Sequence, residues 1–168
     1  ASIDPIGVDK FSDTLGLPLP STEISIQDDN GNHLNINEPG EICIRGPQVM
    51  KGYWNNQEET KRVMTEDGWF KTGDIGIMNE EGFPIIVDRK KDMIIVSGFN
   101  VYPNEIEEVA MMNDDINEAG CIGIKDNKGN ENIKLFVSRV PHSKLTFNEV
   151  LDHCKKYLTG YKIPKFIE

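Results

Sequence analysis

The chain has 168 residues, of which 38% are hydrophobic and 27% charged, a composition typical of one globular domain or two small ones. Its 28 acidic and 18 basic residues give a net charge of −10, which argues against unspecific binding to nucleic acid. The sequence contains neither a run of about 18 apolar residues that could cross a bilayer nor a secretory signal pattern. We therefore expect a cytoplasmic protein.

The cysteines and histidines do not have the spacing of a disulfide framework or a metal site. Three of each are scattered along the chain without a Cys-x-x-Cys pair or a His-x-x-x-His pair. We expect structural or surface roles for all six, and no metal ligands among them: Cys43, Cys121, Cys154, His33, His142 and His153.

The first half of the chain reads as short strands joined by turns. Apolar and polar residues alternate before and after the turn Asp28-Asp29-Asn30-Gly31, and an apolar run resumes after Pro39-Gly40. A second tight turn at 79–82 separates two further apolar runs. The pattern is typical of part of an antiparallel β-barrel or sandwich, with strands at 24–26, 34–36, 42–44, 75–78 and 83–87 and a short helix over 55–64.

After Val87 the pattern changes to a mixture of helices and strands. Pro103 suits the first position of a helix, where its missing N–H costs nothing, and Glu105 favours the helix dipole. Ile106, Val109 and Ala110 would share one face of this helix. Strands are expected at 93–96, 120–124 and 133–137.

The last helix has the clearest signals. Thr146 and Glu149 form a capping box, and Gly160 marks the end of the pattern. Five apolar residues fall on one stripe between them: Phe147, Val150, Leu151, Cys154 and Leu158. The sequence therefore predicts an α+β chain: an antiparallel barrel portion over 1–88, then a small α+β domain over 89–168. Because neither end has the pattern of a natural terminus, we expect a piece of a longer protein.

Two charged residues near this boundary are candidates for a nucleotide site. In "WFKTGDIG", Asp74 follows a glycine at a strand start, where a carboxylate can accept hydrogen bonds from both hydroxyls of a ribose. A Gly-Asp pair is also common in plain turns, and that alternative stays open. In "GFPIIVDRKKD", Arg89 offers a permanently charged planar donor at a hairpin-sized distance from Asp74.

Longer stretches carry a resemblance to a known family. "GYW", "DGWFKTGDIGIMNEEGFPIIVDRKKDMIIVSGFNVYPNEIEEV" and "LTGYKIPK" closely resemble the bacterial long-chain fatty-acid–CoA ligases, members of the adenylate-forming superfamily. The resemblance covers nearly the whole chain. It implies an enzyme that uses ATP and Mg²⁺ to form an acyl-adenylate from a fatty acid and then passes the acyl group to CoA. It also allows a peripheral position at the inner face of the membrane as an alternative to the free cytoplasm.

The resemblance implies roles for individual residues. Asp74 matches the aspartate that holds the ribose hydroxyls of ATP, and Arg89 matches the arginine that also contacts the ribose. Lys91 matches the hinge about which the small domain rotates between the two half-reactions. Gly98 matches the glycine that lets pantetheine pass close to the backbone. A looser match relates three further residues to the CoA nucleotide: Tyr161, Lys162 and Lys165.

Parts of the family pattern are missing from the chain. These are the phosphate-binding glycine-rich loop, the Thr-Glu element that engages phosphate and Mg²⁺, and the adenylation lysine. The chain alone is therefore expected to be inactive, with no complete catalytic set and no metal site. Two alternatives stay open: a ligase for another acid such as an aryl acid, and a nucleotide-binding or scaffold module without catalysis.

Overall fold

The computed structural model describes residues 2–3 and 13–168. The chain divides into two compact units, Ala1–Lys90 and Lys91–Glu168. Each unit has its own β-sheet and its own buried residues. The assignment of these units to a large and a small domain of a ligase stays a prediction.

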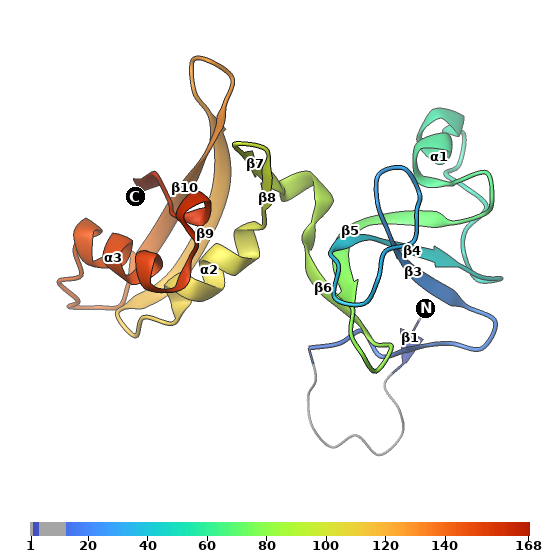
Figure 1. Cartoon of the computed structure of the whole chain (residues 1–168), viewed down its shortest axis with the longest axis horizontal. Coiled ribbons are helices and arrows are strands. Elements are labelled where there is room, and N and C mark those ends of the chain that lie inside the picture. Colours follow the sequence, from blue (N-terminus) through green and yellow to red (C-terminus); the bar gives the residue numbers. More distant parts are fainter. Residues whose placement is uncertain (1, 4–12) are drawn as a thin grey trace. The chain divides into compact units, whose positions relative to one another are not determined.

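The first unit is built on a four-stranded antiparallel sheet (Figure 1). Its strands, in the order in which they pair, are β3 (Glu23–Gln27), β4 (Gly40–Arg45), β5 (Phe70–Met78) and β6 (Pro84–Arg89). The helix α1 (Gln57–Val63) lies between β4 and β5 in the sequence, and β1 (Ser2–Ile3) pairs with β2 (Leu17–Pro18). Among the described residues this sheet is open, with β3 and β6 as its edges, so they form no closed barrel.

Four apolar residues predicted for these strands are buried in the first unit: Ile26, Ile42, Cys43 and Ile75. Trp69, directly before β5, is buried as well. The expected strand at 34–36 is wrong: Leu34 and Asn35 belong to no strand, Ile36 lies in a turn, and the isolated bridge between Gln27 and His33 precedes the segment. Nearby, the carboxylate of Glu38 accepts hydrogen bonds from the backbone and side chain of Asn35, which favours a local turn over a strand.

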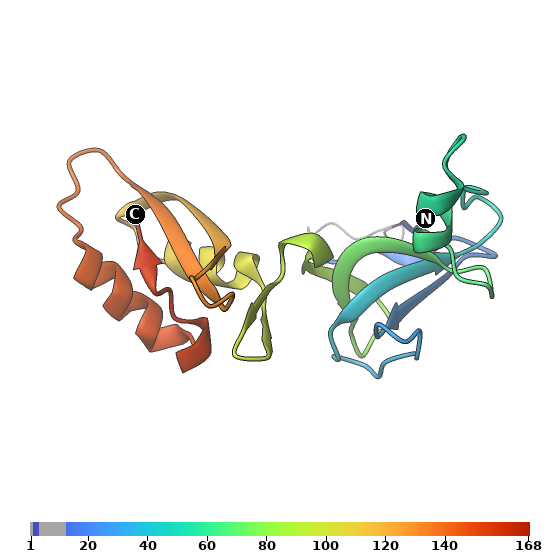
Figure 2. The same cartoon turned by 90° about the horizontal axis from the view of Figure 1, so that it is seen from above.

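The second unit combines a three-stranded sheet, a small hairpin and two helices. The sheet order is β11 (Phe166–Ile167), β10 (Glu131–Arg139), β9 (Ile116–Lys125), and the hairpin consists of β7 (Ile94–Val96) and β8 (Phe99–Val101). The helices α2 (Pro103–Met111) and α3 (Phe147–Tyr157) lie side by side along the β9–β10 ribbon (Figure 2). Two short 3₁₀ turns, at Lys90–Asp92 and Gly160–Lys162, complete the description.

Both helices of this unit begin as the sequence predicts. Pro103 is the first residue of α2, and Thr146 and Glu149 form a complete capping box on α3. The core draws on α2, α3, the hairpin and the sheet: Ile94, Val101, Ile106, Ala110, Ile133, Leu135, Val150 and Cys154.

Two details of the last helix differ from the prediction. Phe147, expected on the buried stripe, is about half exposed because it lies in the first turn. The helix ends at Tyr157 with Leu158 as an extended cap, so Gly160 belongs to the following 3₁₀ turn and does not end the helix. None of the described helices is long and apolar enough to span a membrane.

Candidate functional site

A bulge in β5 presents Asp74. In the β4–β5 pairing Glu41 is opposite Ile75 and Cys43 is opposite Lys71, so Thr72, Gly73 and Asp74 face a single residue of β4. Bulges of this kind redirect side chains and are frequent next to functional sites. The positive φ of Gly73, +77°, is a backbone conformation in which a side chain would be strained.

The hydroxyl of Thr72 holds this bulge in shape. Its Oγ1 donates to the carbonyl of Ile42 at 2.8 Å and accepts from the backbone N–H of Asp74 at 3.1 Å. The carbonyl of Ile42 and the N–H of Asp74 thus have a side-chain partner in place of the hydrogen bonds between strands that the bulge interrupts. Asp74 therefore starts from a fixed backbone position.

Asp74 and Arg89 are direct neighbours across β5 and β6. Arg89 Nε lies 3.0 Å from Asp74 Oδ1, and the side chains are 59% and 24% exposed, respectively. An ion pair this open to water contributes about 0–1 kcal/mol to stability. The pair contributes little to the fold, and its exposure leaves both groups accessible to a ligand.

The residue after Arg89 is held by two carboxylates. Lys90 Nζ donates to Asp29 Oδ1 at 2.7 Å and to Glu41 Oε2 at 2.9 Å. Burial of the ammonium acts to lower the pKa of Lys90, but the hydrogen bonds to Asp29 and Glu41 outweigh it and raise the pKa above its usual value. Lys90 is therefore fixed to the first unit, whereas Lys91 begins the second and is exposed.

Gly98 occupies the two-residue turn between β7 and β8. Ser97 has φ +52° and Gly98 has φ +85°, as a tight hairpin turn of the I′ type requires. A Cβ built on Gly98 would meet no heavy atom within 4 Å. The turn alone gives a reason for glycine here, and the space in front of it is open.

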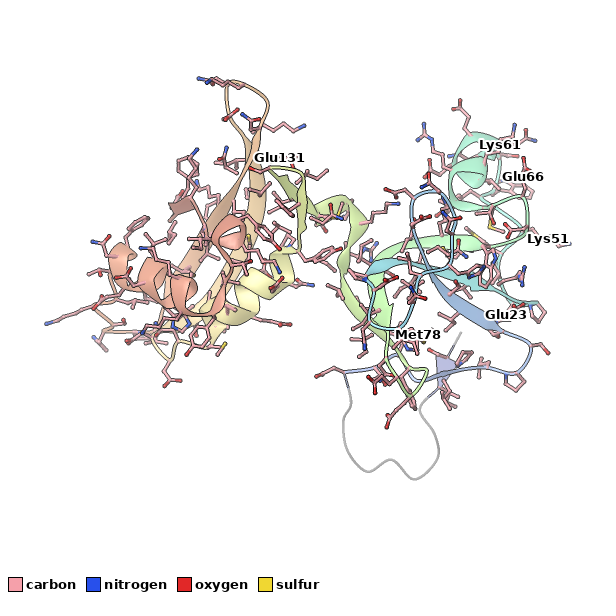
Figure 3. The ribbon with its side chains drawn as sticks, viewed as in Figure 1. Glu23, Lys51, Lys61, Glu66, Met78 and Glu131 are labelled. Atoms are coloured by element: carbon pink, nitrogen blue, oxygen red, sulfur yellow. The ribbon has the colours of Figure 1, made fainter. Side chains whose placement is uncertain are left out.

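The tip of this hairpin lines a hollow of about 700 Å³, called here the hairpin hollow. Its walls come from 95–98, from the turn between β9 and β10, and from Lys165. Glu131 Oε2 accepts the backbone N–H of Ile95 at 2.7 Å, and Figure 3 shows Glu131 at the start of β10 beside β7. Lys165 Nζ donates to Asn132 Oδ1 at 3.0 Å. The structure thus places Gly98 and Lys165 in one hollow.

Tyr161 and Lys162 lie outside the lining of the hairpin hollow. The ring of Tyr161 stacks on Phe99, with ring centroids 4.7 Å apart and an interplanar angle of 21°. Lys162 Nζ is 2.6 Å from both carboxylate oxygens of Glu105 and its side chain is only 18% exposed. These contacts connect the Gly160–Lys162 turn to the hairpin and to the start of α2.

Sequence reasoning missed the residues that support the candidate site. Thr72, Glu41 and Lys90 act on residues up to 61 positions away, and no local motif indicates such contacts. The one available signal was the charged Glu41 directly before the apolar run "ICI". Among the described residues, no group of three or more His, Cys, Asp or Glu is arranged to hold a metal ion.

Comparisons with known proteins match both parts of the chain to one enzyme family. Residues 2–54 match the AMP-binding enzyme profile, and residues 105–168 match the AMP-binding enzyme C-terminal domain. Proteins described as long-chain-fatty-acid–CoA ligases from Yersinia pestis and Haemophilus influenzae are 50% and 52% identical over 165 and 164 residues. Each alignment covers 98% of this chain but 29% of the relative, so the chain spans less than a third of their length.

Solved structures show the same fold. ATP-bound MatB from Rhodopseudomonas palustris matches 99% of this chain and 33% of its own with a TM-score of 0.92 at 33% identity. The o-succinylbenzoate CoA synthetase of Bacillus subtilis, in complex with an acyl-adenylate, matches 92% of this chain and 32% of its own with a TM-score of 0.80 at 38% identity. Together these similarities show that the chain belongs to the AMP-binding enzyme family.

Proposed function

We propose that this chain is part of an ATP-dependent long-chain fatty-acid–CoA ligase. The complete enzyme would convert a fatty acid and ATP to an acyl-adenylate with release of pyrophosphate, and then transfer the acyl group to CoA. The observation that carries the proposal is the exposed Asp74–Arg89 pair at the end of the first unit. Sequence identity near 50% to named fatty-acid ligases supports the choice of acid.

Asp74 and Arg89 have the chemistry to hold the ribose of ATP. A carboxylate accepts two hydrogen bonds from adjacent hydroxyls, and the pairing with Arg89 uses Oδ1. The guanidinium keeps its positive charge at any physiological pH and has further N–H donors for the nucleotide. Thr72 supports this arrangement because it fixes the backbone from which Asp74 projects.

Lys91 is proposed as the hinge between the half-reactions. In this view the first unit, which ends at Lys90, is the end of a large domain with a β-barrel, and Lys91–Glu168 belong to a small mobile domain. Support comes from the contrast between neighbours: Lys90 is tied to Asp29 and Glu41, whereas Lys91 is exposed at the first position of the second unit. Rotation of the backbone at Lys91 then leaves the nucleotide residues undisturbed.

The second unit is proposed to receive CoA. Gly98 would leave room for pantetheine at the hairpin turn, and Lys165 offers a cation in the same hollow. Tyr161 and Lys162 are proposed near the CoA nucleotide on the side where Tyr161 stacks on Phe99. Mg²⁺ would neutralise phosphate charge during adenylation, and we expect its ligands outside the residues described here.

The test uses the complete gene product. Incubation with ATP, Mg²⁺ and a long-chain fatty acid should release pyrophosphate, and addition of CoA should yield acyl-CoA. An aryl acid such as benzoate, assayed in parallel, should give little product. If turnover is higher with the aryl acid, the assignment of a fatty acid as substrate is wrong. If the protein binds nucleotide but releases no pyrophosphate with any carboxylic acid, the assignment as a ligase is wrong.

The isolated 168-residue chain serves as the second arm. It should neither exchange pyrophosphate into ATP nor form acyl-CoA, because it lacks the phosphate loop and the adenylation lysine. Turnover by the purified chain would contradict this assignment of its parts.

A further inference from the structure

Glu41 is a charged residue inside a buried strand. It is 6% exposed, and the two residues that follow it in β4, Ile42 and Cys43, are buried as well. A buried carboxylate is costly unless hydrogen bonds and opposite charge compensate for the lost water. Its partners therefore show what the position does.

The two oxygens of Glu41 reach β5 and the residue that directly follows β6, the two strands that carry the candidate nucleotide pair. Oε1 accepts the backbone N–H of Gly73 at 3.1 Å, and Oε2 accepts from Lys90 Nζ at 2.9 Å. Gly73 directly precedes Asp74, and Lys90 directly follows Arg89. One carboxylate thus joins the chain neighbours of the two residues that form the pair.

The bond to Gly73 compensates for the bulge. Thr72, Gly73 and Asp74 have no individual Cα partners in β4, so pairing with β4 does not fix this segment, and of the three only Asp74 has a partner in β6. Thr72 Oγ1 binds the N–H of Asp74 and Glu41 Oε1 binds the N–H of Gly73. Glu41 and Thr72 therefore both supply side-chain contacts that hold the bulge.

The bond to Lys90 fixes the end of β6. Lys90 also binds Asp29, but that carboxylate is 84% exposed, whereas the side chain of Glu41 is 7% exposed. Screening by water makes the exposed contact the weaker one. Glu41 is therefore the main anchor of the residue that follows Arg89.

We propose that Glu41 is a positioning residue for nucleotide binding. It holds the Gly73 backbone and the Lys90 side chain at the separation that brings Asp74 and Arg89 together across β5 and β6. This role rests on the proposed function of that pair. A purely structural buried ion pair would instead stabilise the first unit without altering how the enzyme uses ATP.

The first experiment needs only the 168-residue chain. ¹H–¹⁵N spectra would be compared for Glu41→Gln, Glu41→Ala and the exposed control Glu81→Gln, with the amide of Gly73 and the Nε–H of Arg89 as readouts. Both Glu41 variants should shift both signals, and the control should shift neither. Glu41→Gln is nearly isosteric and keeps an acceptor for Gly73, so it protects against loss of folding. Unchanged Arg89 signals in a folded Glu41→Ala chain would overturn the proposal.

The second experiment separates positioning from stability in the complete gene product. Glu41→Gln should raise the KM for ATP in pyrophosphate release about tenfold, with kcat changed less than about twofold, because uniform binding is lost. Glu81→Gln should change neither value. A lower melting temperature with an unchanged KM would assign Glu41 a structural role only and overturn the inference.

Asp74→Ala distinguishes failure of this inference from failure of the proposed function. If Asp74→Ala raises the KM for ATP while Glu41→Gln does not, the nucleotide pair stands and the role of Glu41 is wrong. If Asp74→Ala leaves the KM unchanged, the nucleotide role of the pair falls and the role of Glu41 falls with it. The spectra of the isolated chain report on the geometry in either case.

Discussion

Substitution of Gly98 tests whether the turn between β7 and β8 requires a glycine, and the backbone angle of Gly98 predicts how much stability is lost. Gly98 has φ +85°, and a Cβ at this position would meet no heavy atom within 4 Å. The cost of Gly98→Ala is therefore conformational, with no contribution from a clash, and amounts to about 1–2 kcal/mol for a left-handed residue with a side chain. For a unit the size of residues 91–168, each kcal/mol lowers the melting temperature by about 4–8 °C.

Two other glycines of the second unit serve as matched controls. Gly129 has φ +82° and Gly120 has no positive φ, and a Cβ on either would again meet nothing within 4 Å. Gly129→Ala should therefore lower the melting temperature about as much as Gly98→Ala, whereas Gly120→Ala should leave it unchanged or raise it slightly. Calorimetry of the isolated chain measures all three. If Gly98→Ala melts like Gly120→Ala, the strain argument is wrong.

The functional part of the same prediction uses Gly98→Leu in the complete gene product. A side chain in the open space before the turn should block pantetheine, so acyl-CoA formation should fall while pyrophosphate release continues. Strain alone would reduce both half-reactions together and in step with stability. Parallel loss of pyrophosphate release and acyl-CoA formation would therefore refute the channel role and leave only the turn.

Four further predictions concern the boundary and the first unit. Asp74→Ala should raise the KM for ATP at least about tenfold, since a hydrogen bond to a charged acceptor contributes about 1.5–3 kcal/mol; an unchanged KM would remove Asp74 from the site. Lys91→Pro should spare adenylation and slow thioester formation, because proline fixes φ at the hinge; equal loss of both would indicate misfolding. Limited trypsin treatment should cut within Asp88–Asp92, at the end of β6 and the unit boundary, before it cuts any other strand of either unit, and mass spectrometry of the fragments would reveal the opposite order. Burial raises the pKa of the Cys43 thiol to about 11, so the folded state favours the protonated form. The contribution of this protonated thiol to the free energy of unfolding is present below pH 9 and is lost as the pH rises toward about 11. In urea unfolding, the free energy of unfolding should therefore decrease less over this pH range for Cys43→Ala than for the unchanged chain.

Local signals in the sequence predicted the helices better than the strands. Thr146, Glu149 and Pro103 act within one turn of their own helix, so the sequence alone reveals their roles. The alternation of apolar and polar residues at 34–36 wrongly predicted a strand, because hydrogen bonds from Asn35 to the carboxylate of Glu38 stabilise a turn there. The short strand β8 was missed, since three residues are too few for a period to show.

The sequence predicted that Asp74 and Arg89 serve one nucleotide site, but not the geometry of that site. Their direct pairing depends on irregular register on both sides of β5. Bulges arise from contacts between strands, and the contacts of Glu41 and Thr72 are distant in sequence. Sequence periodicity carries no information about such contacts, which explains why the supporting residues were missed.

Two ion pairs of similar composition lead to different conclusions about function. Lys162 is 18% exposed and binds both oxygens of Glu105, so a phosphate at Lys162 would have to displace a carboxylate from a largely desolvated ammonium. Arg89 is 59% exposed, and water already screens its contact with Asp74, so a nucleotide can approach this pair at little cost. Lys165 donates to the neutral side chain of Asn132, its ammonium lies 5.7 Å from the ring centroid of Phe166, and it lines the hairpin hollow. Of the two lysines predicted near CoA, Lys165 is therefore the one that can meet an anionic ligand without the loss of an ion pair.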